Sequence, residues 1–163
     1  MSSPCTVRRA GARDSLALRA IRLEALRDTP EAYGSTYEDS LKWSVRRWRK
    51  VAKTWNYYLG ECGGVVKGMV SGGYNEEQPG TCWLYGMYVA PSERGSGLAT
   101  QLVDAVATWA RADGARQLYL HVNPSVGRAR AFYAKVGFVE NGETIIMDRD
   151  PSITLCTMVK NLD

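Results

Sequence analysis

One segment in the middle of the chain constrains the fold most, because its apolar pattern changes period twice. A strand pattern over residues 81–89 is followed by a glycine-rich turn, a helical pattern over residues 97–113 and a second strand pattern over residues 117–122. In the helical part, apolar residues recur every three or four positions, as they do on a helix with one buried face. Such a unit places its two strands side by side and parallel, with the helix as a right-handed crossover.

The patterns on either side of this unit complete a mixed sheet. No internal repeat or long linker interrupts them, so we expect residues 1–163 to form a single α+β domain. Gly63 and Gly64 favour a tight hairpin turn between two of the strands. The other expected elements are a strand at 6–8, helices at about 14–28 and 40–53, strands at 55–62 and 65–74, a helix at about 127–136, and strands from 138 and at about 154–160.

The two helices expected near the N-terminus carry apolar faces. Asp14 precedes the first helix and is a residue type that commonly caps a helix N-terminus, whereas Pro30 prevents the helix from continuing. The apolar residues recur at the spacing of one buried face. We expect this face to comprise Leu18, Ile21, Ala25 and Leu26 in the first helix, and Leu41, Val45, Trp48 and Val51 in the second.

Charge and hydropathy argue against several classes of protein. A net charge of +4 is far below that of a typical nucleic-acid binder, although it favours a polyanionic ligand. The chain shows neither a signal-peptide pattern nor an apolar run long enough to cross a membrane, so we expect a cytoplasmic protein without a membrane partner. Five basic residues within residues 46–53 are interpreted as a solvated helix face, with an acidic partner surface as the alternative.

The four cysteines are scattered and form no Cys-x-x-Cys pair. They lie at positions 5, 62, 82 and 156, and His121 is the only histidine. This pattern suggests neither a zinc site nor a disulfide framework. We therefore expect buried free thiols and no bound metal.

The turn from Arg94 to Ala99 has the composition of a phosphate-binding site. N–H groups at the start of a helix lack intrahelical partners, and the helix dipole adds about half a positive charge, so anions are attracted there. Gly95 and Gly97 let a phosphate approach closely, and Arg94 adds a formal charge. Neither a dinucleotide fingerprint nor a P-loop fits, because a third glycine and a Gly-Lys-Ser/Thr sequence are missing. On its own, such a turn is also compatible with a simple connection.

In two motifs, the chain resembles the GNAT acetyltransferases, and the resemblance covers most of its length. The acetyl-CoA motif Arg/Gln-x-x-Gly-x-Gly/Ala is matched by Arg94, Gly97 and Ala99, after the usual Val-x-Pro at Val89 and Pro91. The second motif is matched by Ala129, Phe132, Tyr133, Gly137 and Phe138. The resemblance implies an acetyl-CoA-dependent N-acetyltransferase that transfers the acetyl group directly to a primary amine of a small molecule or a peptide.

The resemblance also implies a fold and a place for the cofactor. The fold is a mixed, mostly antiparallel sheet of about six to seven strands with four helices, whose central parallel strands, ending at Val89 and Val122, splay apart. The pantetheine arm of acetyl-CoA would pair with the first of these strands as an added strand does. Many family members carry an asparagine where this chain has Val126, and Asn123 is expected to substitute for it. The expected cofactor-binding residues are Met87, Tyr88, Val89, Arg94, Gly95, Ser96, Gly97, Leu98, Ala99 and Asn123.

Acetyl transfer to an amine requires a base for the ammonium proton and an acid for the departing thiolate. The resemblance implies that Tyr133 is the acid. His121 is a candidate base because its strand should border the cleft and because an imidazole pKa near 6.5 suits proton relay. Its separation from Tyr133 also equals that between a proposed glutamate base and the motif tyrosine in ribosomal-protein acetyltransferases. Glu76, Glu77 and water are the alternatives.

The acceptor is left open by the sequence. Tyr33 and Tyr37 lie in a segment that lines the acceptor pocket in similar proteins, and their rings could surround a cationic amine. Two other interpretations compete with an enzyme: a non-catalytic acyl-CoA sensor on the same fold, and a nucleotide-binding protein that uses the same turn. The presence of Tyr133 favours the enzyme, and a homodimer is left open.

Overall fold

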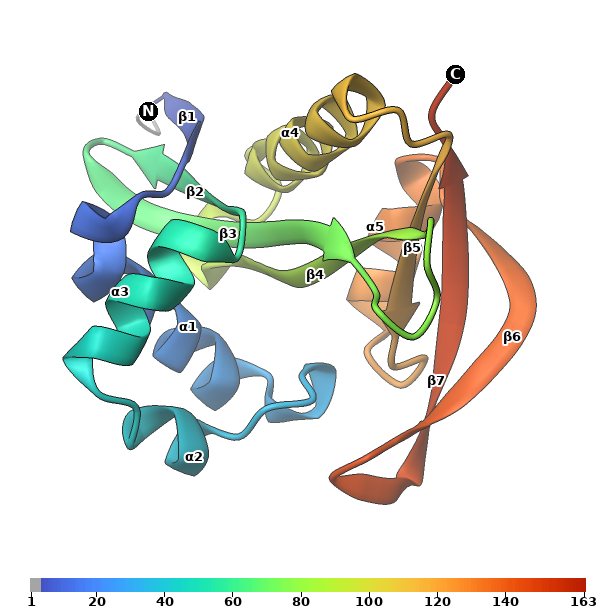
Figure 1. Cartoon of the computed structure of the whole chain (residues 1–163), viewed down its shortest axis with the longest axis horizontal. Helices are drawn as coiled ribbons and strands as arrows, with labels where there is room; N and C mark the ends of the chain where they lie inside the picture. Colours follow the sequence, from blue (N-terminus) through green and yellow to red (C-terminus); the bar gives the residue numbers. More distant parts are fainter. Residues whose placement is uncertain (1–3) are drawn as a thin grey trace.

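The computed structural model describes residues 4–163 as a seven-stranded sheet with helices on both faces (Figure 1). The order of strands in the sheet is β1-β2-β3-β4-β5-β7-β6. The strands are β1 (Cys5–Arg9), β2 (Tyr57–Cys62), β3 (Val65–Tyr74), β4 (Cys82–Val89), β5 (Gln117–Val122), β6 (Val139–Met147) and β7 (Asp150–Asn161). The α-helices are α1 (Ser15–Asp28), α2 (Tyr37–Leu41), α3 (Val45–Thr54), α4 (Leu98–Ala112) and α5 (Gly127–Lys135).

The central pair β4–β5 is parallel and every other pair is antiparallel, which confirms the predicted mixed sheet. The two parallel strands are in register at only two positions, Cys82 with Leu118 and Trp83 with Tyr119. Beyond them β4 bulges, because one more residue is used on β4 than on β3 between successive pairings, and Gly86 within the bulge has a φ of +58°. The predicted splay between the two strands is therefore confirmed.

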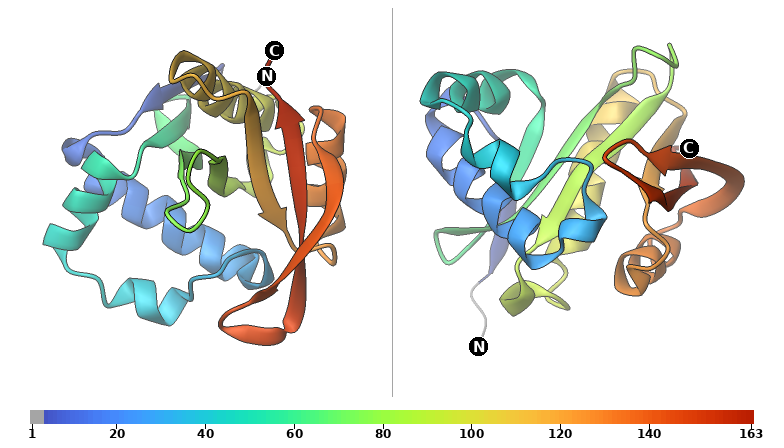
Figure 2. Two further views of the ribbon diagram at one scale, coloured as in Figure 1. Left: turned by 45° about the vertical axis from the view of Figure 1, so that its right-hand side comes forward. Right: turned by 90° about the horizontal axis from the view of Figure 1, so that it is seen from below.

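Two apolar layers fill the spaces between the sheet and its helices. Helices α1 and α3 pack on one face, over buried residues of β2 and β3. Helix α4, which is the predicted crossover, packs on the opposite face together with α5 (Figure 2). The Gly63-Gly64 hairpin also forms as predicted, with both glycines at positive φ. In residues 4–163, no helix combines the length and the apolar character needed to span a bilayer.

The second predicted helix is instead two short helices, so the structure has five α-helices where four were expected. The break has a local cause: the Ser44 hydroxyl accepts a hydrogen bond of 3.1 Å from the Arg47 N–H and thereby caps a new helix at α3. As a result Leu41 and Val45 are 45% and 59% exposed, and their predicted inward placement is wrong. The rest of the predicted apolar face is buried, namely Leu18, Ile21, Ala25, Leu26, Trp48 and Val51.

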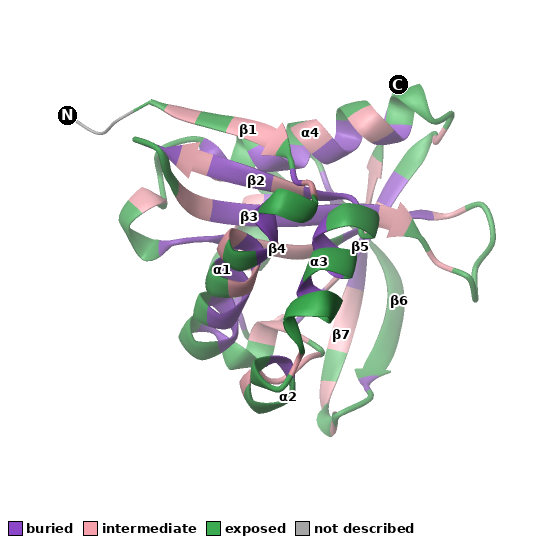
Figure 3. Ribbon diagram, turned by 60° about the vertical axis from the view of Figure 1, so that its left-hand side comes forward, coloured by how far each residue is buried: buried purple, intermediate pink, exposed green. Residues whose placement is uncertain are grey.

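The basic residues of α3 form an exposed face, as predicted (Figure 3). The guanidinium of Arg47 lies 3.8 Å from the centre of the Trp43 ring. The exposed basic side chains are those of Arg46, Arg47, Arg49, Lys50 and Lys53.

Asp14 precedes α1 as expected, but its side chain does not cap the helix. Its carboxylate instead forms an ion pair of 2.7 Å with Arg8 and accepts a hydrogen bond of 2.8 Å from the Gly11 N–H. The same guanidinium reaches Glu61 at 2.8 Å. The Asp14 carboxylate, which was predicted to cap α1, is therefore bound by Arg8 of β1 instead.

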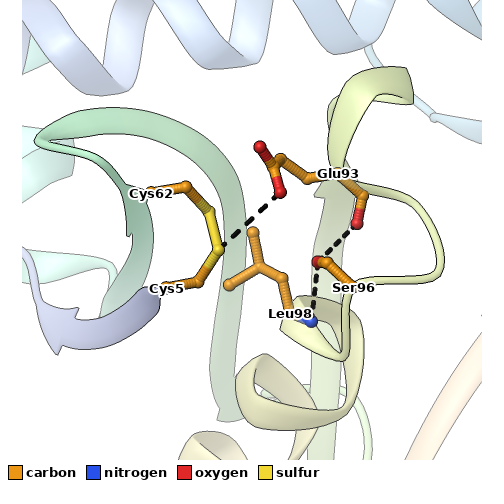
Figure 4. The surroundings of a disulfide bond; sticks show 5 residues. All are labelled: Cys5, Cys62, Glu93, Ser96 and Leu98. Atoms are coloured by element: carbon orange, nitrogen blue, oxygen red, sulfur yellow. Dashed lines mark hydrogen bonds between the residues drawn. A yellow bond between two sulfur atoms is a disulfide. The ribbon is translucent and has the colours of Figure 1, made fainter. Parts of the chain in front are cut away.

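The expectation of four free thiols is wrong, because Cys5 and Cys62 form a disulfide (Figure 4). The two residues are direct partners in the antiparallel register of β1 and β2, with Cα atoms 4.2 Å apart, although 57 positions separate them in the sequence. Glu93, just before the glycine-rich turn, brings a carboxylate oxygen within 3.8 Å of the Cys5 sulfur. Cys82, which is buried, and Cys156, which is half-buried, are free thiols.

Candidate functional site

A cavity of about 240 Å³, called the first cavity, lies where β4 ends and the glycine-rich turn begins. It separates the end of β4 from helix α5, at the place where β4 and β5 have diverged. Its lining residues include Thr29, Ala32, Tyr33, Met87, Tyr88, Val89, Arg94, Gly95, Ala99, Val126, Arg128, Ala129, Phe132 and Tyr133.

The backbone of the turn is open at this cavity. Gly95 and Gly97 have φ values of +85° and +93°, and a Cβ atom added to either would have no neighbour within 4 Å. Among residues 4–163, the N–H groups of Gly95, Gly97 and Ala99 form no backbone hydrogen bond. The helix dipole of α4 adds positive potential at the same point. The turn therefore has the form of an anion-binding site.

Two guanidinium groups meet beside this turn and share one carboxylate. Arg94 donates a hydrogen bond of 2.7 Å to Asp28 at the end of α1, and Arg128 of α5 lies 3.6 Å from the same carboxylate. The hydrogen bond from Arg94 is the main cause that holds the pKa of Asp28 below its ordinary value. Neither Asp28 nor Arg128 was predicted from the sequence. For Arg128 the only signal was its position directly before Ala129 of the second motif.

The end of β4 carries the backbone that was predicted to pair with an extended ligand. Tyr33 and Met87 both line the first cavity, and the Tyr33 hydroxyl donates a hydrogen bond of 2.8 Å to the Met87 carbonyl oxygen. The side chain of Tyr88 is buried against the α1 layer, where its hydroxyl donates to Glu24 at 2.9 Å. Burial raises the pKa of both tyrosines, so both remain protonated donors.

A second cavity, of about 200 Å³, lies on the β5 side of the same splay. It shares Ala32, Tyr33, Met87, Val126, Ala129 and Tyr133 with the first cavity. Tyr133 thus lies at the junction of the two. Burial raises the pKa of its hydroxyl, and in the described part of the chain that hydroxyl forms no hydrogen bond.

His121 lines the second cavity, as the sequence predicted for a residue near the end of β5. Its Nδ1 atom lies 3.2 Å from the Thr157 hydroxyl, and its ring packs on Trp83 with ring centres 4.4 Å apart. Burial lowers the pKa of His121, an effect that the charge of Glu143 partly opposes. The alternatives Glu76 and Glu77 lie exposed in the loop after β3 and line neither cavity.

Three of the predicted site residues do not place their side chains in the first cavity. Ser96 bonds within the turn, donating to the Glu93 carbonyl oxygen at 2.6 Å, and Leu98 is fully buried in the core. The Asn123 side chain donates to the Glu31 carbonyl oxygen at 3.0 Å and accepts from both the N–H and the hydroxyl of Ser125, at the edge of the second cavity. Asn123 thus holds two loops together.

Tyr33 and Tyr37 were predicted to line one acceptor pocket, but the structure separates them. Tyr33 faces both cavities. Tyr37 begins α2, its ring lies under the guanidinium of Arg27 at 5.4 Å, and it lines a different depression that includes Arg149.

Comparison with known proteins gives one family and one fold. The sequence profile described as "Acetyltransferase (GNAT) family" matches residues 18–138. No curated protein sequence matches the chain at a significant level.

Solved structures share the fold at low sequence identity. An N-acetyltransferase from Staphylococcus aureus Mu50 superposes with a TM-score of 0.75 at 24% identity, covering 99% of this chain and 100% of that one. The protein yncA from Salmonella typhimurium, solved with its cofactor acetyl-CoA, superposes with a TM-score of 0.74 at 22% identity, covering 99% of this chain and 95% of that one. A ribosomal-protein-alanine N-acetyltransferase from Brucella melitensis superposes with a TM-score of 0.72 at 24% identity, covering 96% of this chain and 99% of that one.

Proposed function

The chain belongs to the acetyltransferase (GNAT) family, and from that premise we propose that it transfers the acetyl group of acetyl-CoA directly to a primary amine of a small molecule or a peptide. The observation that carries the proposal is the position of Tyr133 at the junction of two cavities. One cavity ends at an anion-binding turn and the other contains the only histidine. Two ligands that enter from opposite sides would therefore meet at the Tyr133 hydroxyl.

The residues of the first cavity fit acetyl-CoA, which supplies the acetyl group as a thioester. The open amides of Gly95, Gly97 and Ala99, together with Arg94, would hold the pyrophosphate. The backbone at the end of β4 would face the pantetheine arm, and Arg128 adds a second charge to the phosphate end. The unpaired N–H groups and the space above the two glycines support this placement.

Tyr133 is proposed as the general acid. Its raised pKa keeps the hydroxyl protonated throughout the neutral range, so it can donate a proton to sulfur as negative charge develops there. Because the Tyr133 hydroxyl forms no hydrogen bond in the described chain, its proton is not committed elsewhere.

His121 is proposed as the base that removes a proton from the acceptor ammonium. Burial lowers its pKa, so the imidazole is neutral and able to accept a proton at pH 7. The role requires the tautomer in which the Nδ1–H donates to the Thr157 hydroxyl, because Nε2 then carries no proton and can accept one. Its place in the second cavity supports this role, because the amine is expected to approach from that side.

The test of this function is release of free thiol from acetyl-CoA in the presence of a panel of amines, with Tyr133→Phe as the key variant. We expect turnover to fall by about 10²- to 10⁴-fold while the KM for acetyl-CoA stays nearly constant, because the hydroxyl acts chiefly in the transition state. Tyr119→Phe, which removes a hydroxyl bonded only to Gln117, is the matched control.

Two outcomes would contradict the proposal. If the protein binds coenzyme A in calorimetry but acetylates no amine, the sensor interpretation replaces the enzyme. If ATP or NAD binds and coenzyme A does not, the turn serves a different nucleotide. A parental single-turnover rate in Tyr133→Phe would remove that residue from the mechanism.

A further inference from the structure

A third cavity, of about 590 Å³, lies beside the bulge of β4 and opens toward the second. The two cavities share Tyr33, Gly34, Tyr85 and Gly86 as lining residues. Its other walls include three aromatic rings, from Trp55, Tyr57 and Trp109, and the polar side chains of Ser35, Thr54, Asn56 and Ser71. Its volume lies within the range of small-molecule sites. A molecule in the third cavity could therefore extend into the place where transfer is proposed to occur.

Among residues 4–163, Arg22 of α1 is the only charged residue that lines the third cavity. The residue is 9% exposed, and in the described chain it forms no ion pair with a carboxylate. Its guanidinium donates one hydrogen bond to the Tyr57 hydroxyl at 2.6 Å and one to the Ser35 hydroxyl at 3.0 Å. A guanidinium has five N–H groups, and the Nε–H of Arg22 has no partner within the described part of the chain.

An unpaired buried cation of this kind is unusual. Guanidinium groups stay charged in proteins, and removing a charge from water is costly unless an opposite charge and hydrogen bonds replace the water. The two neutral hydroxyl partners and the Trp43 ring, 5.6 Å from the guanidinium, provide only part of that compensation. A ligand anion in the cavity would complete it.

The guanidinium of Arg22 lies close to the cavities where acetyl transfer is proposed to occur. A Cβ atom added to Gly86 would lie 3.3 Å from the Tyr57 hydroxyl oxygen and 3.9 Å from Nη1 of Arg22. Gly86 lines both the second and the third cavity, and Met87 follows it at the junction with the first. An anion bound at Arg22 would therefore lie beside Gly86, which directly precedes Met87 at the junction of the two cavities that Tyr133 also lines.

We propose that Arg22 binds the carboxylate of the acceptor, so that the acceptor is a free amino acid, or a similar amino-carboxylate, with an apolar side chain. This proposal rests on the proposed acetyl transfer, because it assigns the acceptor of that reaction. A planar carboxylate matches a guanidinium, whereas a phosphate would call for more positive charge than this cavity holds. The aromatic rings, and the lack of a second charged side chain among the described lining residues, favour an apolar side chain over a charged one.

The first test uses the unmodified protein and three acceptors of the same shape: phenylalanine, phenylalanine amide and phenethylamine. We expect kcat/KM for phenylalanine to exceed that of the other two by about 10- to 100-fold, as is typical when a hydrogen bond to a charged group is removed. Equal values for all three would overturn the proposal.

The second test replaces the charge with Arg22→Met. Activity toward phenylalanine should fall by about 10- to 100-fold, while phenethylamine should stay within about threefold of its parental value. Arg47→Met, which removes an exposed guanidinium that also contacts the Trp43 ring, is the control. An equal loss for both acceptors would show that Arg22 is structural. Arg22→Lys, which keeps a positive charge, should retain part of the preference if Arg22→Met does not fold.

A third measurement separates this proposal from the proposed function. If no amine is acetylated, calorimetric titration of the protein with phenylalanine still reports the carboxylate site. Binding that is lost in Arg22→Met and kept in Arg47→Met would support the site even though the reaction had been misassigned. Acetylation of amines without any preference for a carboxylate would leave the reaction standing and overturn the site.

Discussion

Arg94 of the glycine-rich turn, which lines the first cavity, forms an ion pair of 2.7 Å with Asp28 at the end of α1. Both side chains are about one third exposed or less. The carboxylate thus lies where the phosphates of acetyl-CoA are proposed to bind, and it competes with them for Arg94. A change at Asp28 should therefore alter cofactor affinity.

We expect Asp28→Asn to tighten binding of coenzyme A by about two- to fivefold. The substitution removes a competing negative charge, and exposed ion pairs of this type are worth only about 0.2 to 1 kcal/mol. Calorimetric titration with coenzyme A measures the change. Glu140→Gln, which removes an equal charge from the exposed pair with Arg130, should leave affinity unchanged. Weaker binding in Asp28→Asn would mean that the carboxylate positions Arg94 for the cofactor.

We expect Ala99→Phe to weaken coenzyme A binding by more than about tenfold without unfolding the protein. Ala99 lines the first cavity from the first turn of α4, so a larger ring would fill the space proposed for the cofactor. A helical position also avoids the backbone strain of a substitution at Gly97, whose φ is +93°. Thr108→Phe, at an exposed site of the same helix, is the control. Parental affinity in Ala99→Phe would place the cofactor elsewhere.

The pH profile tests His121. Because burial lowers its pKa, the imidazole of the folded protein loses its proton below the ordinary value of about 6.5. Activity should therefore rise as pH increases through a value below 6.5 and be level above it, and His121→Gln should abolish that rise.

The acceptor for this profile should be an alkylamine whose own pKa is above about 9, so that it stays an ammonium throughout and its titration does not overlap with that of the imidazole. The free energy of unfolding should likewise increase as pH rises through this range. A histidine with a lowered folded pKa binds fewer protons than in the unfolded chain, so its neutral form is stabilising and that contribution is lost as pH falls below about 6.5. A rise in activity that persists in His121→Gln would assign the base to another group.

We expect reduction of the Cys5–Cys62 disulfide to lower the free energy of unfolding by about 2 to 4 kcal/mol. The bridge closes a long segment of chain, with a sequence separation of 57, and so restricts the unfolded state. For a chain of this size the loss corresponds to about 5 to 15 °C in Tm. Thermal unfolding with and without a dithiol reductant measures it.

The double variant Cys5→Ser, Cys62→Ser should unfold at the temperature of the reduced parent and be insensitive to the reductant. Cys156→Ser, which removes a free thiol, should keep the parental response. Equal Tm values for the oxidised and reduced parent would show that the bridge adds no stability.

Periodicity and motifs predicted the parts of this structure that depend on local sequence. The buried positions of α1 and the crossover helix α4 follow from apolar spacing, because each helix packs one face on the sheet. The turn at Gly95 and Gly97 was predicted because residues without a Cβ let a phosphate approach closely, and the structure adds that both have positive φ. The break at Ser44 could not be distinguished from an internal helical serine, because only the cap geometry separates the two.

The remaining features depend on contacts between distant positions. Cys5 and Cys62 become partners only through the register of β1 and β2, and no spacing rule encodes that register. In the sequence, nothing distinguishes Arg22 from an arginine on the exposed face of α1. Its side chain is buried because it packs against Tyr57, which lies 35 positions away. Asp28 likewise meets Arg94 from a separate element.

The narrow seam between β4 and β5 has a mechanical consequence. The two portions of the sheet are joined at the paired positions of Cys82 with Leu118 and Trp83 with Tyr119, while each portion is cross-linked internally by longer antiparallel ladders. The sheet therefore behaves as two stiff plates with a short common edge, and bending between the plates concentrates there. Such bending changes the width of the splay, so the rate at which ligands enter and leave should depend on the stiffness of this edge rather than on any lid.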